Sequence, residues 1–185
     1  MTTKNHELLA IRGYGSTIVE AAFRMADLPV DRVEIDASNR GRLTAANPLA
    51  QVPTLFLPGG EVLTESAAIV LYLNDLRPDA GLLPPPGDPD RARSLRWLVF
   101  LVAALYPTFA LGTPREALWR QLEAEARGPW FLGERRSAID PYLAVMTRWD
   151  PAPWFAEHAP KLAAIARRAA EDPEIGPVLR ANFDG

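Results

Sequence analysis

The most informative stretch of the sequence is Asn47-Pro48-Leu49-Ala50-Gln51-Val52-Pro53-Thr54-Leu55, and the pair Glu65-Ser66 follows eleven residues after Thr54. A proline directly before a predicted strand is unusual, because proline cannot donate a hydrogen bond to a neighbouring strand. A cis Val52–Pro53 bond would explain it, since such a bond turns the chain sharply and leaves the backbone groups of Val52 free to pair with an extended peptide. The alternative is an ordinary proline on an edge strand.

Glu65 and Ser66 stand at the predicted start of the next helix. The free amide groups and the dipole at a helix N-terminus favour a carboxylate, and the Glu65 side chain is suited to an ammonium group. Together with Val52, the pair predicts a seat for a small peptide that has a free amino-acid end. The alternative is that the two residues only cap the helix.

Strand and helix patterns alternate before residue 78. Short apolar runs predict strands over 8–11, 33–35, 54–57 and 61–64, and a glycine turn joins the last two. Helical spacing predicts helices over 16–26, 42–47 and 66–77, with Ser16 as the N-cap of the first. The order βαβαββα predicts an α/β domain over residues 1–78.

Proline and glycine dominate the segment 77–89, which cannot hold a helix or an interior strand. We therefore expect a linker over 79–90 and a second domain over 91–185. Helical spacing in that domain predicts helices over 91–106, closed by Pro107, and over 114–127, with apolar stripes over 139–149 and 162–169. Gly176-Pro177 is expected to interrupt the tail. The fold class is α/β plus all-α, in which a helical bundle follows the sheet domain.

The composition excludes several kinds of chemistry. The sequence has no cysteine, so a disulfide, an iron–sulfur cluster or a protein thiol nucleophile is impossible. Twenty basic and 23 acidic residues leave a net charge of −3, which argues against a nucleic-acid or anionic membrane partner. The two histidines, His6 and His158, fall in different predicted domains, so no metal site is expected. The start lacks a secretory signal, and the apolar run 97–106 is too short to cross a bilayer of about 30 Å, which favours a soluble cytoplasmic protein.

The motifs resemble those of the cytosolic glutathione transferases, and in particular the bacterial beta-type group. The matching pieces are Asn47-Pro48-x-x-Gln51-Val52-Pro53, the run from Glu61 to Leu73, then Arg91, Trp97 and Leu105-Tyr106-Pro107, and finally Phe131-Leu132-Gly133 with Ser137-x-x-Asp140, which has the spacing of a helix capping box. The resemblance covers most of the chain. It implies a thioredoxin-like first domain, a helical second domain and a two-fold homodimer.

The resemblance also implies glutathione as co-substrate and a role for each matching residue. Val52 would pair through its backbone with the cysteinyl part of glutathione, and Pro53 would be the cis proline. Glu65 and Ser66 would hold the γ-glutamyl end, and Gln51 would flank the tripeptide.

Two positions depart from the beta-type pattern. Gly15 stands where many members have a cysteine, and Tyr106 stands where the family has a histidine. Any chemistry must therefore use the thiol of bound glutathione, and lowering its pKa from about 8.5 by two units requires roughly 2.7 kcal/mol of preferential stabilisation. A hydroxyl that donates to the thiolate is the expected source. Ser16 is the first candidate, with Tyr14, Thr17 and Tyr106 as alternatives, and helix capping is the alternative role for Ser16.

The function predicted on this basis is conjugation of the glutathione thiolate to a small hydrophobic electrophile held against the helical domain. One alternative is a glutathione-dependent peroxidase, isomerase or reductase that uses the same ligand seat. The other is a non-catalytic binding module of the same fold, because the region 109–133 is short compared with typical family members.

Overall fold

The computed structural model describes residues 5–184, and its first half is built on one four-stranded sheet. The strands lie in the order β2-β1-β3-β4. β1 (His6–Ala10) pairs in parallel with β2 (Val30–Glu34) and antiparallel with β3 (Thr54–Phe56), which forms a hairpin with β4 (Val62–Thr64). The predicted order βαβαββα and the mixed sheet of a thioredoxin-like domain are confirmed.

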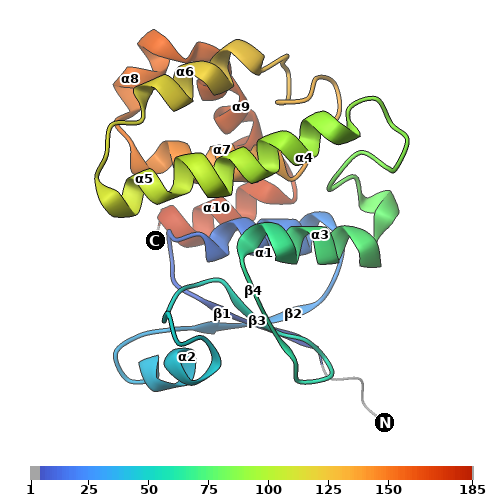
Figure 1. Cartoon of the computed structure of the whole chain (residues 1–185), viewed down its shortest axis with the longest axis vertical. Helices are drawn as coiled ribbons and strands as arrows, with labels where there is room; N and C mark the ends of the chain where they lie inside the picture. Colours follow the sequence, from blue (N-terminus) through green and yellow to red (C-terminus); the bar gives the residue numbers. More distant parts are fainter. Residues whose placement is uncertain (1–4, 185) are drawn as a thin grey trace.

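Helices cover both faces of the sheet, which separates α2 (Arg40–Ala46) from α1 (Ser16–Met25) and α3 (Ser66–Leu76) (Figure 1). Successive side chains of a strand point to opposite faces, so Leu8 joins the main core with α1 and α3 whereas Leu9 joins a small core with Leu43 of α2. The remaining helices stack beyond α1 and α3 (Figure 1).

The second half is helical within the described residues, as expected. A 3₁₀ turn (Pro78–Ala80) lies in the proline-rich segment that we propose as the linker. The helices that follow are α4 (Arg91–Phe100), a π-helix (Leu101–Leu105), α5 (Tyr106–Leu111), α6 (Glu116–Glu125), α7 (Ile139–Met146) with a 3₁₀ turn (Thr147–Trp149), α8 (Ala152–His158), α9 (Pro160–Glu171) and α10 (Ile175–Phe183). Every residue of α7 is buried, and α7 packs against both α1 and α9, so it connects the two halves.

Three predictions about the helices are wrong. The first bundle helix does not stop at Pro107 but continues as α5, because the wider π turn just before it accommodates a residue that lacks an amide proton. Gly176-Pro177 does not break the tail: both residues lie in the first turn of α10, where amide groups have no helical acceptor. The N-cap of α1 is Gly15, and Ser16 is the first helical residue.

The helix that runs without interruption from Arg91 to Leu111 is also longer than the apolar run in the sequence suggests. By length and composition alone its 21 residues could cross a membrane, which the run 97–106 did not predict. Trp97, Leu98 and Leu101 pack into the protein core, yet only 28% of its most apolar window is buried. Much of this apolar helix therefore lies on the surface of the single chain.

Asp140 holds the start of α7 from inside the core. Its carboxylate accepts hydrogen bonds from the backbone amides of Phe131 (2.9 Å) and Ser137 (2.7 Å). One bond of the capping box predicted from the spacing of Ser137 and Asp140 is thus present, whereas the Ser137 hydroxyl accepts from the Ile139 amide (3.3 Å) and the N-cap is Ala138. Burial raises the pKa of Asp140 from 3.8 to about 6, while the two amides pull the pKa down in part.

Candidate functional site

A cavity of about 570 Å³ lies where the start of the bundle meets the edge of the first half. The first half contributes the residues around the turn before β3 and the start of α3, and the second half contributes one side of the π-helix and α5. The lining includes Tyr14, Arg40, Gln51, Val52, Pro53, Glu65, Ser66, Val102, Tyr106, Pro107 and Leu111. Of the residues singled out in the sequence as catalytic or glutathione-binding, all line this cavity except Ser16 and Thr17.

The turn before β3 is held by side chains rather than by the strand ladder. The Asn47 amide donates to the carbonyl of Gln51 (3.1 Å), and the Thr54 hydroxyl donates to the same carbonyl (2.9 Å). The Val52–Pro53 peptide bond is cis, as the sequence predicted. Within residues 5–184, the N–H and C=O of Val52 take part in no hydrogen bond. The turn therefore presents an unpaired donor and an unpaired acceptor at the cavity wall.

The start of α3 forms the adjoining wall. Ser66 is the first helical residue, and the preceding Glu65 has a left-handed backbone with φ of 65°. The Glu65 carboxylate is exposed, whereas Ser66 is buried and its hydroxyl accepts a hydrogen bond from Tyr142 (2.8 Å). A helix N-terminus with a hydroxyl attracts an anion, and the neighbouring carboxylate attracts a cation.

Ser16 does not reach this cavity. It is completely buried, and its hydroxyl donates to the carbonyl of Ile11 (3.0 Å) and accepts from the Ile11 amide (3.1 Å). Thr17 is also completely buried. The sequence predicted Ser16 as the N-cap, with its hydroxyl near the glutathione sulfur. In the structure Gly15 is the N-cap and Ser16 is the first helical residue, so its side chain points into the protein.

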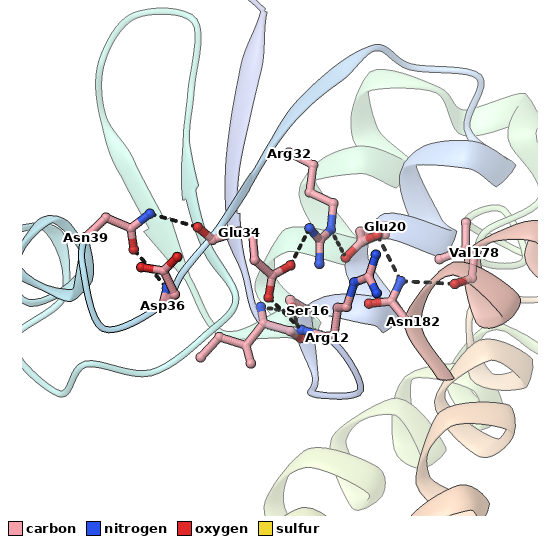
Figure 2. A network of polar contacts seen from close by, with 10 residues as sticks. Arg12, Ser16, Glu20, Arg32, Glu34, Asp36, Asn39, Val178 and Asn182 are labelled. Atoms are coloured by element: carbon pink, nitrogen blue, oxygen red, sulfur yellow. Dashed lines mark hydrogen bonds and ion pairs between the residues drawn. The ribbon is translucent and has the colours of Figure 1, made fainter. Parts of the chain in front are cut away.

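Charged side chains close to Ser16 form a structural network instead of a site (Figure 2). Arg32 lies between Glu20 (2.8 Å) and Glu34 (2.6 Å). Glu20 also accepts a hydrogen bond from the Asn182 amide of α10 (3.2 Å). The network joins β2, α1 and α10, and none of its residues lines the cavity.

Tyr106 occupies the space that a side chain at position 15 would need. Its hydroxyl oxygen lies 2.7 Å from the position of a Cβ atom built on Gly15. Burial raises the pKa of Tyr106, although the Gly15 amide lowers it in part, so the phenol stays protonated at neutral pH. The ring packs edge-on against Trp149 (5.3 Å), whose indole N–H donates to the carbonyl of Gly13 (2.7 Å).

Tyr14 also lines the cavity, but 56% of its surface is exposed. Of the four hydroxyl candidates, Tyr106 is thus the one held in a fixed position at the cavity wall. Its fixed position depends on the bundle, which is why sequence spacing could not distinguish it from Ser16 or Tyr14.

Arg40 is a cavity residue that sequence reasoning missed. It is the first residue of α2, and it is exposed. A cation in the first turn of a helix is opposed by the helix dipole, and that unfavourable placement is a signal of a role outside the helix. Arg40 provides the cavity with a second anion-binding group.

Other parts of the described chain offer less. A smaller cavity of about 330 Å³ lies beside Arg115 and Asp150, but these two side chains are bonded to each other (2.9 Å). Within residues 5–184 no group of three His, Cys, Asp or Glu side chains could hold a metal ion.

Comparisons with known proteins agree on one group. Residues 16–76 match the family model described as glutathione S-transferase, N-terminal domain. The chain is 35% identical to an uncharacterized GST-like protein of Escherichia coli K12, over 95% of this chain and 98% of that protein. The structure of a sphingomonad glutathione S-transferase complexed with glutathione is 32% identical (TM-score 0.80; 95% and 98% covered), and a bacterial beta class enzyme of Sphingomonas chungbukensis is 30% identical (TM-score 0.78; 96% and 98%).

Proposed function

Because the chain belongs to the cytosolic glutathione S-transferase family, we propose that it binds glutathione in the cavity and transfers its thiolate to a small hydrophobic electrophile. The observation that carries this proposal is the unpaired backbone of Val52 at the cavity wall, next to the start of α3. The bound tripeptide in the similar sphingomonad structure supports the choice of ligand. A cytoplasmic location stays a prediction that fits this function, since the cytosol holds a glutathione pool.

Glutathione has charged groups at both ends, and we assign a cavity residue to each. The backbone of Val52 would pair with the cysteinyl residue as a strand edge does. The Ser66 hydroxyl and the α3 amides would bind the γ-glutamyl carboxylate, and Glu65 would bind its ammonium group. Arg40 would bind the glycyl carboxylate, and Gln51 would flank the tripeptide.

The chemical step requires a thiolate next to an apolar surface. The Tyr106 hydroxyl would donate to the sulfur and favour the thiolate, with Tyr14 as the second donor and Ser16 outside the site. Val102, Pro107 and Leu111 would provide the apolar surface for the electrophile. With an aryl halide, the sulfur–carbon bond forms, the halide leaves with its electron pair, and the thiol proton passes to solvent.

Replacing Ser66 with alanine is expected to weaken glutathione binding about 10- to 100-fold, because a hydrogen bond to a charged group contributes about 1.5–3 kcal/mol. Calorimetric titration with glutathione and S-hexylglutathione measures the change. Ser94→Ala is the matched control, since that hydroxyl bonds to the Arg91 carbonyl (2.8 Å) and does not line the cavity. If the unchanged protein does not bind glutathione at all, the proposal fails.

Turnover separates the transferase from the alternatives. Conversion of an aryl halide supports conjugation, whereas conversion of hydroperoxides or of a cis–trans substrate alone would indicate the peroxidase or isomerase. Binding without any turnover would indicate a module that only binds glutathione.

We also infer that the chain forms a homodimer. Val62 of β4, Leu76 of α3 and Val99 of α4 are large apolar residues that lie exposed on the single chain. The first part of the largely uncovered apolar helix, α4 with Val99, adds exposed apolar side chains, whereas the far end of that helix at Leu111 lies at the cavity. Exposed large apolar side chains are a feature of protein–protein interfaces, and the family resemblance points to a second copy as the partner.

Val99→Glu is expected to raise the dimer dissociation constant at least about 100-fold, because an unpaired charge buried in an interface costs several kcal/mol. Sedimentation at micromolar concentration measures the oligomeric state. Leu111→Glu is the control: Leu111 is more exposed than Val99 but lies at the cavity. Equal dissociation of both variants would contradict an interface at Val99, and a monomeric unchanged protein would contradict the dimer.

A further inference from the structure

One hydrogen bond links the core of the helical half to the predicted glutathione seat. Tyr142 lies in α7, and its hydroxyl donates to the hydroxyl oxygen of Ser66 at the start of α3 over 2.8 Å. The two residues are 76 positions apart in the sequence. Tyr142 is completely buried and does not line the cavity, so it cannot touch a ligand there.

Within residues 5–184 the buried Tyr142 hydroxyl has no other acceptor for its proton, so it donates to Ser66, and this direction determines what Ser66 can do. A serine hydroxyl has one proton to donate and two lone pairs to accept with. The Tyr142 proton uses one lone pair of the Ser66 oxygen, and within residues 5–184 no group accepts the Ser66 proton. The proton therefore remains available to an anion in the cavity, and a donor behind the hydroxyl strengthens that second bond.

Tyr142 is suited to donate at all ordinary pH values. Tyr142 is completely buried, and burial raises its pKa, so the phenol stays protonated. Since α7 packs against both α1 and α9, the phenol is held by the core of the protein. Such a fixed donor sets the rotamer of Ser66 before a ligand arrives.

We propose that Tyr142 is a positioning residue for the substrate: it orients the Ser66 hydroxyl so that its proton points at the γ-glutamyl carboxylate of glutathione. This inference rests on the proposed function, and it adds a residue of the helical half to the recognition of the tripeptide. The seat is then complete only when both halves of the chain are folded together.

Tyr142→Phe is expected to raise the dissociation constant and the KM for glutathione about tenfold, while kcat stays within about twofold, because the lost bond orients the ligand and not the sulfur. Tyr72→Phe is the matched control: Tyr72 lies on α3, and its hydroxyl contacts His6 (3.0 Å) away from the cavity. We expect that control to leave both constants unchanged.

A general loss of packing would weaken binding in any background, so two further measurements isolate the hydroxyl. In a Ser66→Ala background, Tyr142→Phe should have no additional effect on the dissociation constant. Tyr142→Phe should also leave unchanged the dissociation constant of γ-aminobutyryl-cysteinylglycine, a glutathione analogue that keeps the amine and lacks the carboxylate that Ser66 would bind. An equal effect of Tyr142→Phe in these backgrounds would overturn the inference.

A labelled protein tests the inference without a substitution at position 142. The chain has four tyrosines, so incorporated fluorotyrosine gives few fluorine resonances, which Tyr→Phe variants at 14, 72 and 106 assign by elimination. The Tyr142 resonance should shift with glutathione and not with the truncated analogue. If the protein binds glutathione while this resonance and the Tyr142→Phe constants stay unchanged, the inference alone fails. If the unaltered protein binds no glutathione, the proposed function fails with it.

Discussion

Tyr106→Phe is expected to raise the pKa of the glutathione thiol in the complex by about one to two units, and to lower turnover at neutral pH roughly 10- to 100-fold. The phenol is partly buried at the cavity wall and beside Gly15, at the start of α1. A donor in such a place favours the thiolate over the thiol, and its removal leaves the sulfur with only the more exposed Tyr14 as a hydroxyl donor. Thiolate absorbance against pH, followed in the complex, measures the shift directly.

Two variants distinguish this role from general damage to the site. Tyr14→Phe removes a hydroxyl that is more than half exposed, so we expect a smaller change in the thiol pKa. Gly15→Ala places a methyl group 2.7 Å from the Tyr106 oxygen, which must push the phenol aside and reproduce the loss of activity. A thiol pKa that is unchanged in Tyr106→Phe and raised in Tyr14→Phe would transfer the donor role to Tyr14.

Local spacing indicates a candidate peptide seat in one short stretch of chain, and the family resemblance favours that seat over a plain edge-strand proline and helix cap. The turn before β3 and the start of α3 are separated by a single hairpin, so Val52 and Ser66 are close in any fold that contains it. The apolar periods likewise predicted the order of the strands and helices. These features depend on neighbours within about ten residues, which a sequence displays directly.

The remaining features depend on contacts between distant segments. The helix α1 has its N-cap one residue earlier than predicted. Because successive helical side chains point about 100° apart, the side chain of Ser16 faces the protein interior and not the cavity. Tyr142 acts across 76 positions, and no periodicity distinguishes it from any other buried aromatic residue. Arg40 enters the cavity because the sheet brings α2 beneath the turn before β3. Such positions follow from tertiary packing, which outweighs local pattern.

Two residues of the second half, Tyr142 and Trp149, contact residues of the candidate site. Trp149 holds the carbonyl of Gly13 and packs on Tyr106, and Tyr142 holds Ser66. These bonds place both ends of the ligand seat under the control of α7 and the residues that follow it. The stability of α7 is therefore a condition for binding as well as for folding.

Asp140→Ala is expected to lower the free energy of unfolding by roughly 3–5 kcal/mol, a large part of the 5–15 kcal/mol typical of a domain. Asp140 has no exposed surface, and the substitution removes both acceptors of the Phe131 and Ser137 amides, so these amides lose their partners inside the core. Denaturant unfolding measures the loss. A loss below about 1 kcal/mol would mean that the two amides find other partners.

The pH dependence of the same residue has a sign opposite to ordinary acid denaturation. The pKa of Asp140 is about 6 in the folded protein and 3.8 as the ordinary value, so the folded state binds more protons between these values. Its contribution to stability is complete below about pH 4 and is lost as the pH rises through 6. Asp140→Asn keeps the shape and removes the titration. Relative to that variant, the unfolding free energy of the unchanged protein should rise by about 1–1.5 kcal/mol from pH 7 to pH 5. A fall over the same range would show that the two amides lower the pKa of Asp140 more than burial raises it.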